Sequence, residues 1–377
     1  MITKSARARR AAAPGAIGAA ALMSLTLAVW PSTATAGPLR TEGPAPVATA
    51  APAVSAGQVN RHRQRTTFDL EGHRGARGLR PEDTLPAFRK ALDIGVRTLE
   101  LDTGVTKDGV VIVSHERFIA PLVCTDTAPV TPGDPQYPYV GKLYHELTYA
   151  QVETVDCGSR HPVDPTTDPY YASQLPVPGT RIPTLDQVFR LVERRHASHV
   201  QLNIETKIDP THPDETLPPG AFTRADLAVI RRHRDGIARS LLQSFDWRTL
   251  DVARRLAPQL RRVALVGTDT VQAGQPGASP WLDGLDVDSF GGDIAATAAA
   301  PRVRADVLSP DQTLVTAGLL TSAHRHHELV VPYTVDDVRT MLALIDLGVD
   351  GLISDFPDRL RDVLNSLGFT LPRRYPS

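Results

Sequence analysis

Short apolar segments of strand length recur along this chain, and segments with helical periodicity separate most of them. Predicted strands cover 68–72, 98–103, 110–114, 200–205, 241–245, 263–266, 305–309, 329–334 and 351–354. Helical patterns cover 84–94, 185–195, 224–232, 247–255 and 335–347. Thr84 and Thr184 stand where the first two helices begin and are the expected N-caps. Alternating strands and helices predict a parallel sheet, and this many units in one domain predict an α/β fold, the (β/α)8 TIM barrel.

Nine predicted strands are one more than such a barrel contains. Only residues 104–109 separate the second strand from the third, and they end in Asp108-Gly109, a strong turn signal. These two strands are therefore expected to form a hairpin, which leaves eight main strands. Pairing centred on the Asp-Gly turn would set Asp102 opposite His115.

The N-terminus has the organisation of a secretory signal peptide. Four basic residues lie among the first ten, an apolar stretch follows over 16–29, and small residues permit cleavage after Ala36. We expect residues 1–36 to be a signal peptide and the protein to be secreted, with an N-terminal membrane anchor as the alternative. Residues 37–65, rich in Pro and Ala, are a predicted flexible linker. The barrel domain is expected over 66–377.

Charge argues against two classes of partner. Cleavage after Ala36 would remove four of the 41 basic residues and none of the 42 acidic ones, which leaves a slightly negative protein. Bulk charge therefore gives no support for binding to nucleic acid or to an anionic membrane. Beyond the N-terminus, we find no stretch long enough to cross a bilayer, so stable membrane insertion is not expected.

Residues 117–182 depart from the strand and helix alternation. They contain ten prolines, six of the eight tyrosines, and both cysteines, Cys124 and Cys157. In an exported protein two cysteines most simply form a disulfide, with two buried free thiols as the alternative. An insertion that follows the hairpin is a candidate lid or substrate wall. A rigid surface segment without substrate contact is the other interpretation.

Carboxylates occur at the ends of two predicted strands, where barrel active sites are built. Period-two alternation puts Glu100 and Asp102 on one face of their strand, and Glu205 and Lys207 on one face of theirs. Three carboxylates that face one barrel mouth cannot all stay ionised and buried without a cation. Glu100, Asp102 and Glu205 are therefore predicted ligands of one divalent cation. An all-oxygen set suits Ca²⁺ or Mg²⁺, with Mn²⁺ possible, rather than zinc.

Two histidines also stand at strand ends. His73 is followed by Arg74 after the first strand, and His115 follows the third. Histidines beside an arginine, the Lys207 ammonium and a carboxylate cluster are predicted to act as an acid and base pair.

At these residues the chain resembles the glycerophosphodiester phosphodiesterase family, over about 68–365. The motifs that carry the resemblance are His73-Arg74-Gly75, Pro81-Glu82-Asp83-Thr84, Ala87-Phe88, Gly95, Glu100-Leu101-Asp102, Thr106-Lys107-Asp108-Gly109, Ser114-His115, Asn203-Ile204-Glu205-Thr206-Lys207, Ser244-Phe245 and the segment from Gly348 to Pro357. Each motif is common alone, but their order and spacing together are specific.

The resemblance implies a barrel that hydrolyses glycerophosphodiesters, as small-molecule substrates, to glycerol 3-phosphate and an alcohol. By this resemblance Glu100, Asp102 and Glu205 hold the metal, and His73 and His115 are the general base and acid. Arg74 and Lys207 contact the phosphate, and Phe245 and Tyr333 belong to the substrate site. The likeness also implies attack by the neighbouring glycerol hydroxyl, which gives a cyclic phosphate that water then opens.

Three departures from the family pattern occur: Glu116 replaces Asp, Asp83 replaces Asn, and Tyr333-Thr334-Val335-Asp336 stands where Trp-Thr-Val-Asn is common. None removes a proposed ligand or a proton-transfer group, so we expect substrate preference to differ rather than activity to be lost.

Two other functions fit the same fold. A phospholipase C- or D-like enzyme acting on intact lipid would have an apolar rim, and the insertion lacks a strong run of Leu, Ile or Phe. A non-catalytic barrel that binds phosphodiesters or cell-wall polymer would be expected to lose a histidine or a metal carboxylate. This chain keeps all of them.

Overall fold

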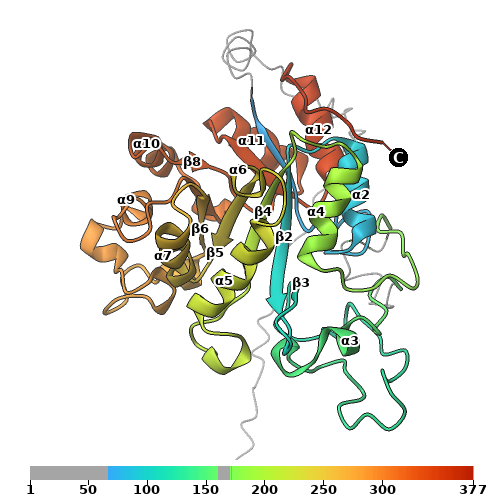
Figure 1. Cartoon of the computed structure of the whole chain (residues 1–377). Coiled ribbons are helices and arrows are strands. Elements are labelled where there is room, and N and C mark those ends of the chain that lie inside the picture. The colour runs from blue at the N-terminus through green and yellow to red at the C-terminus, as the bar shows by residue number, and fades with distance from the viewer. Residues whose placement is uncertain (1–66, 160–169, 171, 377) are drawn as a thin grey trace, which may run out of the picture. The chain divides into compact units, whose positions relative to one another are not determined.

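All nine predicted strand segments form strands, and their pairing makes a barrel. Eight of them pair side by side in the order β8-β7-β6-β5-β4-β2-β1-β9, and every neighbouring pair is parallel. Backbone hydrogen bonds from Asp350 to Val330 and from Ile353 to Pro332 join β9 to the chain at β8 and complete the ring. Helices lie around the strands (Figure 1). The predicted TIM barrel is confirmed.

The computed structural model describes residues 67–159, 170 and 172–376. The strands are β1 (Asp69–Gly72), β2 (Thr98–Val105), β3 (Val111–Val113), β4 (Gln201–Thr206), β5 (Ser240–Ser244), β6 (Arg261–Val266), β7 (Val307–Pro310), β8 (Leu329–Val330) and β9 (Gly351–Ser354). The α-helices are α2 (Leu85–Ile94), α3 (Tyr149–Val152), α4 (Leu185–Arg194), α5 (Pro219–Ile230), α6 (Gly236–Arg239), α7 (Trp247–Leu256), α8 (Thr268–Val271), α9 (Ile294–Ala298), α10 (Ala317–Arg325), α11 (Val338–Leu347) and α12 (Pro357–Ser366). Short 3₁₀ helices are η1 (Tyr144–Glu146), η2 (Pro213–Glu215), η3 (Pro280–Leu282), η4 (Val287–Phe290) and η5 (Gln312–Leu314). The predicted signal peptide and linker lie outside the described residues and stay predictions.

Local sequence explains where the first helices begin. The Thr84 hydroxyl accepts a hydrogen bond from the Ala87 amide, and the Thr184 hydroxyl accepts one from the Gln187 amide. Gln187 also reaches back to the Thr184 amide, which completes a capping box. Both predicted N-caps are confirmed.

The hairpin forms, but its predicted register is wrong by one residue. Thr103 pairs with Val113 and Val105 with Val111, and the Ser114 amide donates to the Asp102 carbonyl at 3.0 Å. Asp102 therefore lies opposite Ser114 rather than His115. The reason is the turn: Gly109 has φ of 80° and ends a three-residue loop, whereas the prediction assumed a two-residue Asp-Gly turn.

The barrel interior has an apolar side and a polar side. Leu241, Val263, Val307, Val331 and Ile353 come from five different strand segments and pack together as one cluster. Across the interior, hydrogen bonds join a set of buried polar side chains, Glu71, Glu100, Asn203 and Gln243. These four polar side chains lie on β1, β2, β4 and β5.

The described part of the insertion over residues 117–182 packs around a small apolar core that also includes Ile112 of β3. This part extends beyond the C-terminal end of β2 (Figure 1). Cys124 and Cys157 form a disulfide, as predicted, and lie in a buried cluster with Tyr139, Tyr144 and other apolar residues. The insertion is thus a packed unit at the end of the barrel where the predicted site residues stand.

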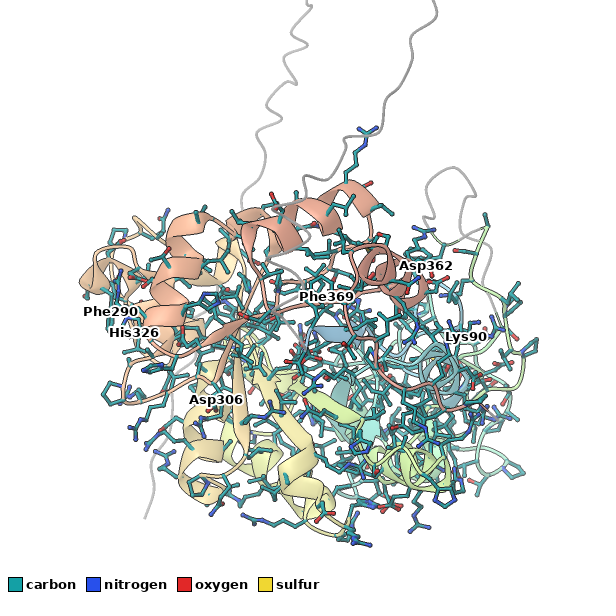
Figure 2. The ribbon with its side chains drawn as sticks, turned by 90° about the horizontal axis from the view of Figure 1, so that it is seen from above. Lys90, Phe290, Asp306, His326, Asp362 and Phe369 are labelled. Carbon is teal, nitrogen blue, oxygen red and sulfur yellow. A yellow bond between two sulfur atoms is a disulfide. The ribbon has the colours of Figure 1, made fainter. Side chains whose placement is uncertain are left out.

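Helices surround the barrel on several sides. Seen from above, Lys90 of α2 and Asp362 of α12 lie on one side of the molecule, and Phe290 and His326 lie on the other (Figure 2). Within the described part of the chain, we find no helix with the length and apolar character of a membrane span.

Candidate active site

The C-terminal ends of the strands hold one cavity of ≈ 250 Å³. All nine residues predicted for the site line it: His73, Arg74, Glu100, Asp102, His115, Glu205, Lys207, Phe245 and Tyr333. They come from segments up to 260 positions apart in the sequence, and the parallel strands bring them together. The structure therefore places the predicted residues at one site, while their individual roles stay predictions.

Three carboxylates form the centre of the cavity wall. Glu100, Asp102 and Glu205 are buried, and one oxygen from each lies within 4.8 Å of the other two. Glu100 is fixed on both sides, because Oε2 accepts from the Arg74 amide at 2.8 Å and Oε1 accepts from Gln243 Nε2 at 2.7 Å. The strand pairing sets Asp102 directly beside Glu205. Among the described residues, no other such group of His, Cys, Asp or Glu could hold a metal ion.

Their electrostatics favour a bound cation. Burial, and then the charge of Asp102, raise the pKa of Glu100 well above its usual value. Burial raises the pKa of Glu205 to about 7, although the Lys207 ammonium opposes this shift. Burial also opposes ionisation of Asp102, but Lys207, His115 and Arg74 outweigh it and hold the pKa of Asp102 well below its usual range. The three carboxylates thus compete for ionisation unless more positive charge enters.

The ligand set fits a hard divalent cation. Its donors are carboxylate oxygens, which suit Ca²⁺, Mg²⁺ and Mn²⁺. Asp102 Oδ2 is buried, and among the described residues it has no hydrogen-bond partner, although Arg74 Nε lies 3.2 Å away as an ion pair. A buried carboxylate oxygen without a hydrogen bond is costly, and a cation would satisfy it.

His73 is held from behind by a carboxylate. Its Nδ1 lies 2.6 Å from Asp355 Oδ1, and its Nε2 lies 3.9 Å from Glu100 Oε2. Burial lowers the pKa of His73, while the Asp355 charge opposes that shift. A bond at Nδ1 fixes the ring and leaves Nε2 directed toward the carboxylate cluster, which is the arrangement needed for proton transfer.

His115 is less enclosed. Its side chain is 29% exposed, and Nδ1 lies 2.9 Å from Oε1 of Glu116. Burial, together with the nearby Lys207 and Arg74 charges, lowers the pKa of His115 to about 4. Glu116, one of the three departures from the family pattern, thus supports His115 as Asp355 supports His73.

The two predicted phosphate-binding cations lie beside the carboxylates. Lys207 Nζ is 2.8 Å from Glu205 Oε1 and 3.6 Å from Asp102 Oδ1. Arg74 extends between Asp102 and Glu82, with Nη1 2.8 Å from Glu82 Oε1. Both cations are nearly buried, so each can attract an anionic group that enters the cavity.

Part of the cavity lining is apolar. Phe245 and Tyr333 meet edge to face with ring centroids 5.7 Å apart, and Leu265 and Ile353 lie beside them. The Tyr333 hydroxyl donates to the Val266 carbonyl at 3.0 Å, which fixes the ring. Lys207 Nζ lies 6.0 Å from the Phe245 ring centroid. The cavity can therefore hold a molecule that is anionic on one side and carbon-rich on the other.

Sequence reasoning assigned no role to three further residues at this site. Asp355 follows β9 directly, so the rule that found the histidines at strand ends could also have found it. Gln243 lies within β5 and positions Glu100. Arg77 lines the cavity from the loop after β1, where no periodic pattern marks it.

Comparison with known proteins gives consistent results. Residues 73–359 match the model of the glycerophosphoryl diester phosphodiesterase family. A glycerophosphodiester phosphodiesterase of Caldanaerobacter subterraneus is 24% identical over 296 residues, which cover 78% of this chain and 97% of that protein.

Solved structures share the fold. A candidate glycerophosphoryl diester phosphodiesterase from Silicibacter pomeroyi has 28% identity and a TM-score of 0.67, over 81% of this chain and 95% of that one. An Oleispira antarctica phosphodiesterase, solved with its product sn-glycerol 3-phosphate, has 19% identity and a TM-score of 0.54, over 78% of this chain and 96% of that one.

Proposed function

This chain is an enzyme of the glycerophosphoryl diester phosphodiesterase family, whose members hydrolyse glycerophosphodiesters, and we propose that it does so with one divalent cation and two histidines. The products would be glycerol 3-phosphate and an alcohol. The observation that carries this proposal is the gathering of three carboxylates, two cations and two histidines around one cavity. The Oleispira product complex supports the choice of glycerol 3-phosphate as one product.

The residues present match the needs of phosphodiester hydrolysis. The substrate is an anion, so Arg74 and Lys207 bind its phosphate oxygens and offset the charge that builds during attack. Phe245 and Tyr333 pack against the carbon skeleton of the alcohol or glycerol. A divalent ion bound by Glu100, Asp102 and Glu205 would mask phosphate charge and help to ionise an attacking hydroxyl.

Proton transfer falls to the two histidines. A hydroxyl nucleophile must lose a proton, and an alkoxide leaving group must gain one. His73 offers Nε2 to the cavity because Asp355 holds its Nδ1, and His115 lines the same cavity from the hairpin strand. One histidine can therefore act as the base while the other acts as the acid.

Hydrolysis of a panel of glycerophosphodiesters, with and without a chelator, tests this function. We expect release of glycerol 3-phosphate that stops with chelator and returns on addition of Ca²⁺, Mg²⁺ or Mn²⁺. Turnover that is unchanged after complete metal removal would contradict the metal-dependent mechanism. The absence of hydrolysis with every metal would contradict the substrate class.

One observation favours a second candidate, activity on a lipid diester that carries an acyl chain. Leu122 is 74% exposed and Leu175 is 56% exposed, and both belong to the insertion. Leu122 precedes Val123, which lines a second small cavity together with His115. The Leu175 amide donates to the Leu79 carbonyl, in the loop that also contains Arg77. We infer that these two exposed leucines form part of an apolar rim, of the kind that lipid-acting members would need.

Kinetics on lysolipid micelles and on glycerophosphocholine separate the two candidates. If the enzyme acts on lipids, Leu122→Asp and Leu175→Asp should lower turnover of micelles and leave the soluble diester unchanged. Leu347→Asp, a comparably apolar site that is 43% exposed at the end of α11, is the matched control. Equal rates for all variants on micelles would exclude a lipid-binding rim.

A further inference from the structure

We propose that Tyr170, from the insertion, is a positioning residue for His73, an inference that rests on the function proposed above. The Tyr170 hydroxyl donates a hydrogen bond to Asp355 Oδ2, and Asp355 Oδ1 lies 2.6 Å from His73 Nδ1. Tyr170, Asp355 and His73 thus form one hydrogen-bonded chain, and its last member faces the cavity. The insertion therefore takes part in building the acid and base pair.

Asp355 is the central member of this hydrogen-bonded series. Asp355 is 1% exposed, so its carboxylate oxygens must find partners within the protein. Each oxygen has its own: Oδ1 holds His73, and Oδ2 accepts from Tyr170, with Arg77 Nη1 farther away at 3.9 Å. A carboxylate bound at both oxygens cannot rotate freely about its Cβ–Cγ bond. The hydrogen bond between Asp355 Oδ1 and His73 Nδ1 therefore also restricts rotation of the His73 ring.

Tyr170 is itself held in place from several directions. The Arg77 guanidinium lies 4.9 Å from the centroid of the Tyr170 ring, and the Phe356 ring centroid lies 6.0 Å away. Farther along, Gln174 Nε2 donates to the Arg77 carbonyl at 2.8 Å, and the Leu175 amide donates to the Leu79 carbonyl at 3.1 Å. Gln174 and Leu175 are thus bonded to the same loop that follows His73.

The chemistry of the hydroxyl supports a donor role. Burial and the nearby Asp355 charge both raise the pKa of Tyr170 well above its usual value. The hydroxyl therefore keeps its proton, and a buried carboxylate that accepts from a neutral hydroxyl makes a strong, short bond.

The change Tyr170→Phe removes this hydroxyl and keeps the ring that packs on Arg77 and Phe356. Tyr139→Phe is the matched control, because Tyr139 also donates to an aspartate of the insertion, Asp134 Oδ2 at 2.7 Å, and does not line the cavity. On a glycerophosphodiester we expect Tyr170→Phe to lower kcat by about 10-fold and to change KM by less than about twofold. Tyr139→Phe should leave both constants unchanged.

A double-mutant cycle separates positioning from direct substrate contact or a general loss of structure. If Tyr170 acts through His73, Tyr170→Phe should cost no further activity once His73 is changed to Ala. An equal loss in both backgrounds, or a normal kcat for Tyr170→Phe while His73→Ala is impaired, would overturn this inference alone. Normal turnover by His73→Ala would overturn the proposed mechanism and this inference with it.

Discussion

Glu328 is a buried carboxyl group at the end of the barrel away from the cavity, and the pH dependence of stability tests its raised pKa. It stands between α10 and β8, is 1% exposed, and among the described residues neither carboxylate oxygen has a hydrogen-bond partner. Burial, and then the charges of Asp293 and Asp306, raise the pKa of Glu328 from 4.5 to about 8. At pH values between these two pKa values, Glu328 is protonated in the folded state and ionised in the unfolded chain.

The sign and size of the effect follow from proton linkage. Because the folded state binds the extra proton, the free energy of unfolding falls as pH rises through this window. One proton corresponds to about 1.4 kcal/mol for each pH unit. The titration of Glu328 should therefore lower the free energy of unfolding by about 2–3 kcal/mol as the pH rises from 5.5 to 7.5. The change Glu328→Gln removes the titration. The difference in stability between Glu328→Gln and the parent protein should therefore grow by about 2–3 kcal/mol over that range.

Urea unfolding followed by the fluorescence of the buried Trp247 measures this difference. Any fixed effect of the amide on packing cancels, because only the change with pH is compared. Glu153→Gln makes the same chemical substitution at an exposed position and is the control. A stability difference between Glu328→Gln and the parent that stays constant from pH 5.5 to 7.5 would show that the pKa of Glu328 is not raised in the folded protein.

Three further predictions concern the site and the insertion. His73→Ala and His115→Ala should each lower turnover of glycerophosphodiesters by about 10²–10⁴-fold. On a nitrophenyl diester, loss of the histidine that serves as acid should lower turnover far less, because the leaving group needs little protonation. Near-normal turnover by both variants on glycerophosphodiesters would exclude the mechanism. Glu205→Gln should weaken binding of Ca²⁺ or Mg²⁺ in calorimetry, since it removes one of three carboxylate ligands, and unchanged affinity would remove Glu205 from the site. Mass analysis of secreted protein should find an N-terminus at Gly37 and a mass two hydrogens below that of the reduced form. The Cys124–Cys157 bond should stabilise the fold by roughly 3–4 kcal/mol. Two free thiols in the secreted protein would contradict the disulfide.

Much of the site could be predicted because strand ends in a parallel barrel converge. Periodicity located the strands, alternation put Glu100 and Asp102 on one face, and the barrel brought Glu205 to them. The same rule reached His73 and His115, whereas the separate assumption of a two-residue turn gave the wrong pairing for His115. Register depends on whether two or three residues make the turn, and that choice shifts the partner of every residue in the hairpin.

Local periodicity and strand ends were enough to predict the barrel, the caps at Thr84 and Thr184, and the carboxylates and histidines of the mouth. Phe245 and Tyr333 came from the family resemblance. The groups that lie behind these residues depend on how the whole chain folds. Tyr170 reaches Asp355 from 185 positions away, through an insertion that has no periodic pattern. Burial raises the pKa of Glu205 to about 7, whereas the charges of Lys207, His115 and Arg74 hold the pKa of the neighbouring Asp102 well below its usual range. Such long-range contacts depend on the packing of the folded chain, and no local pattern encodes them.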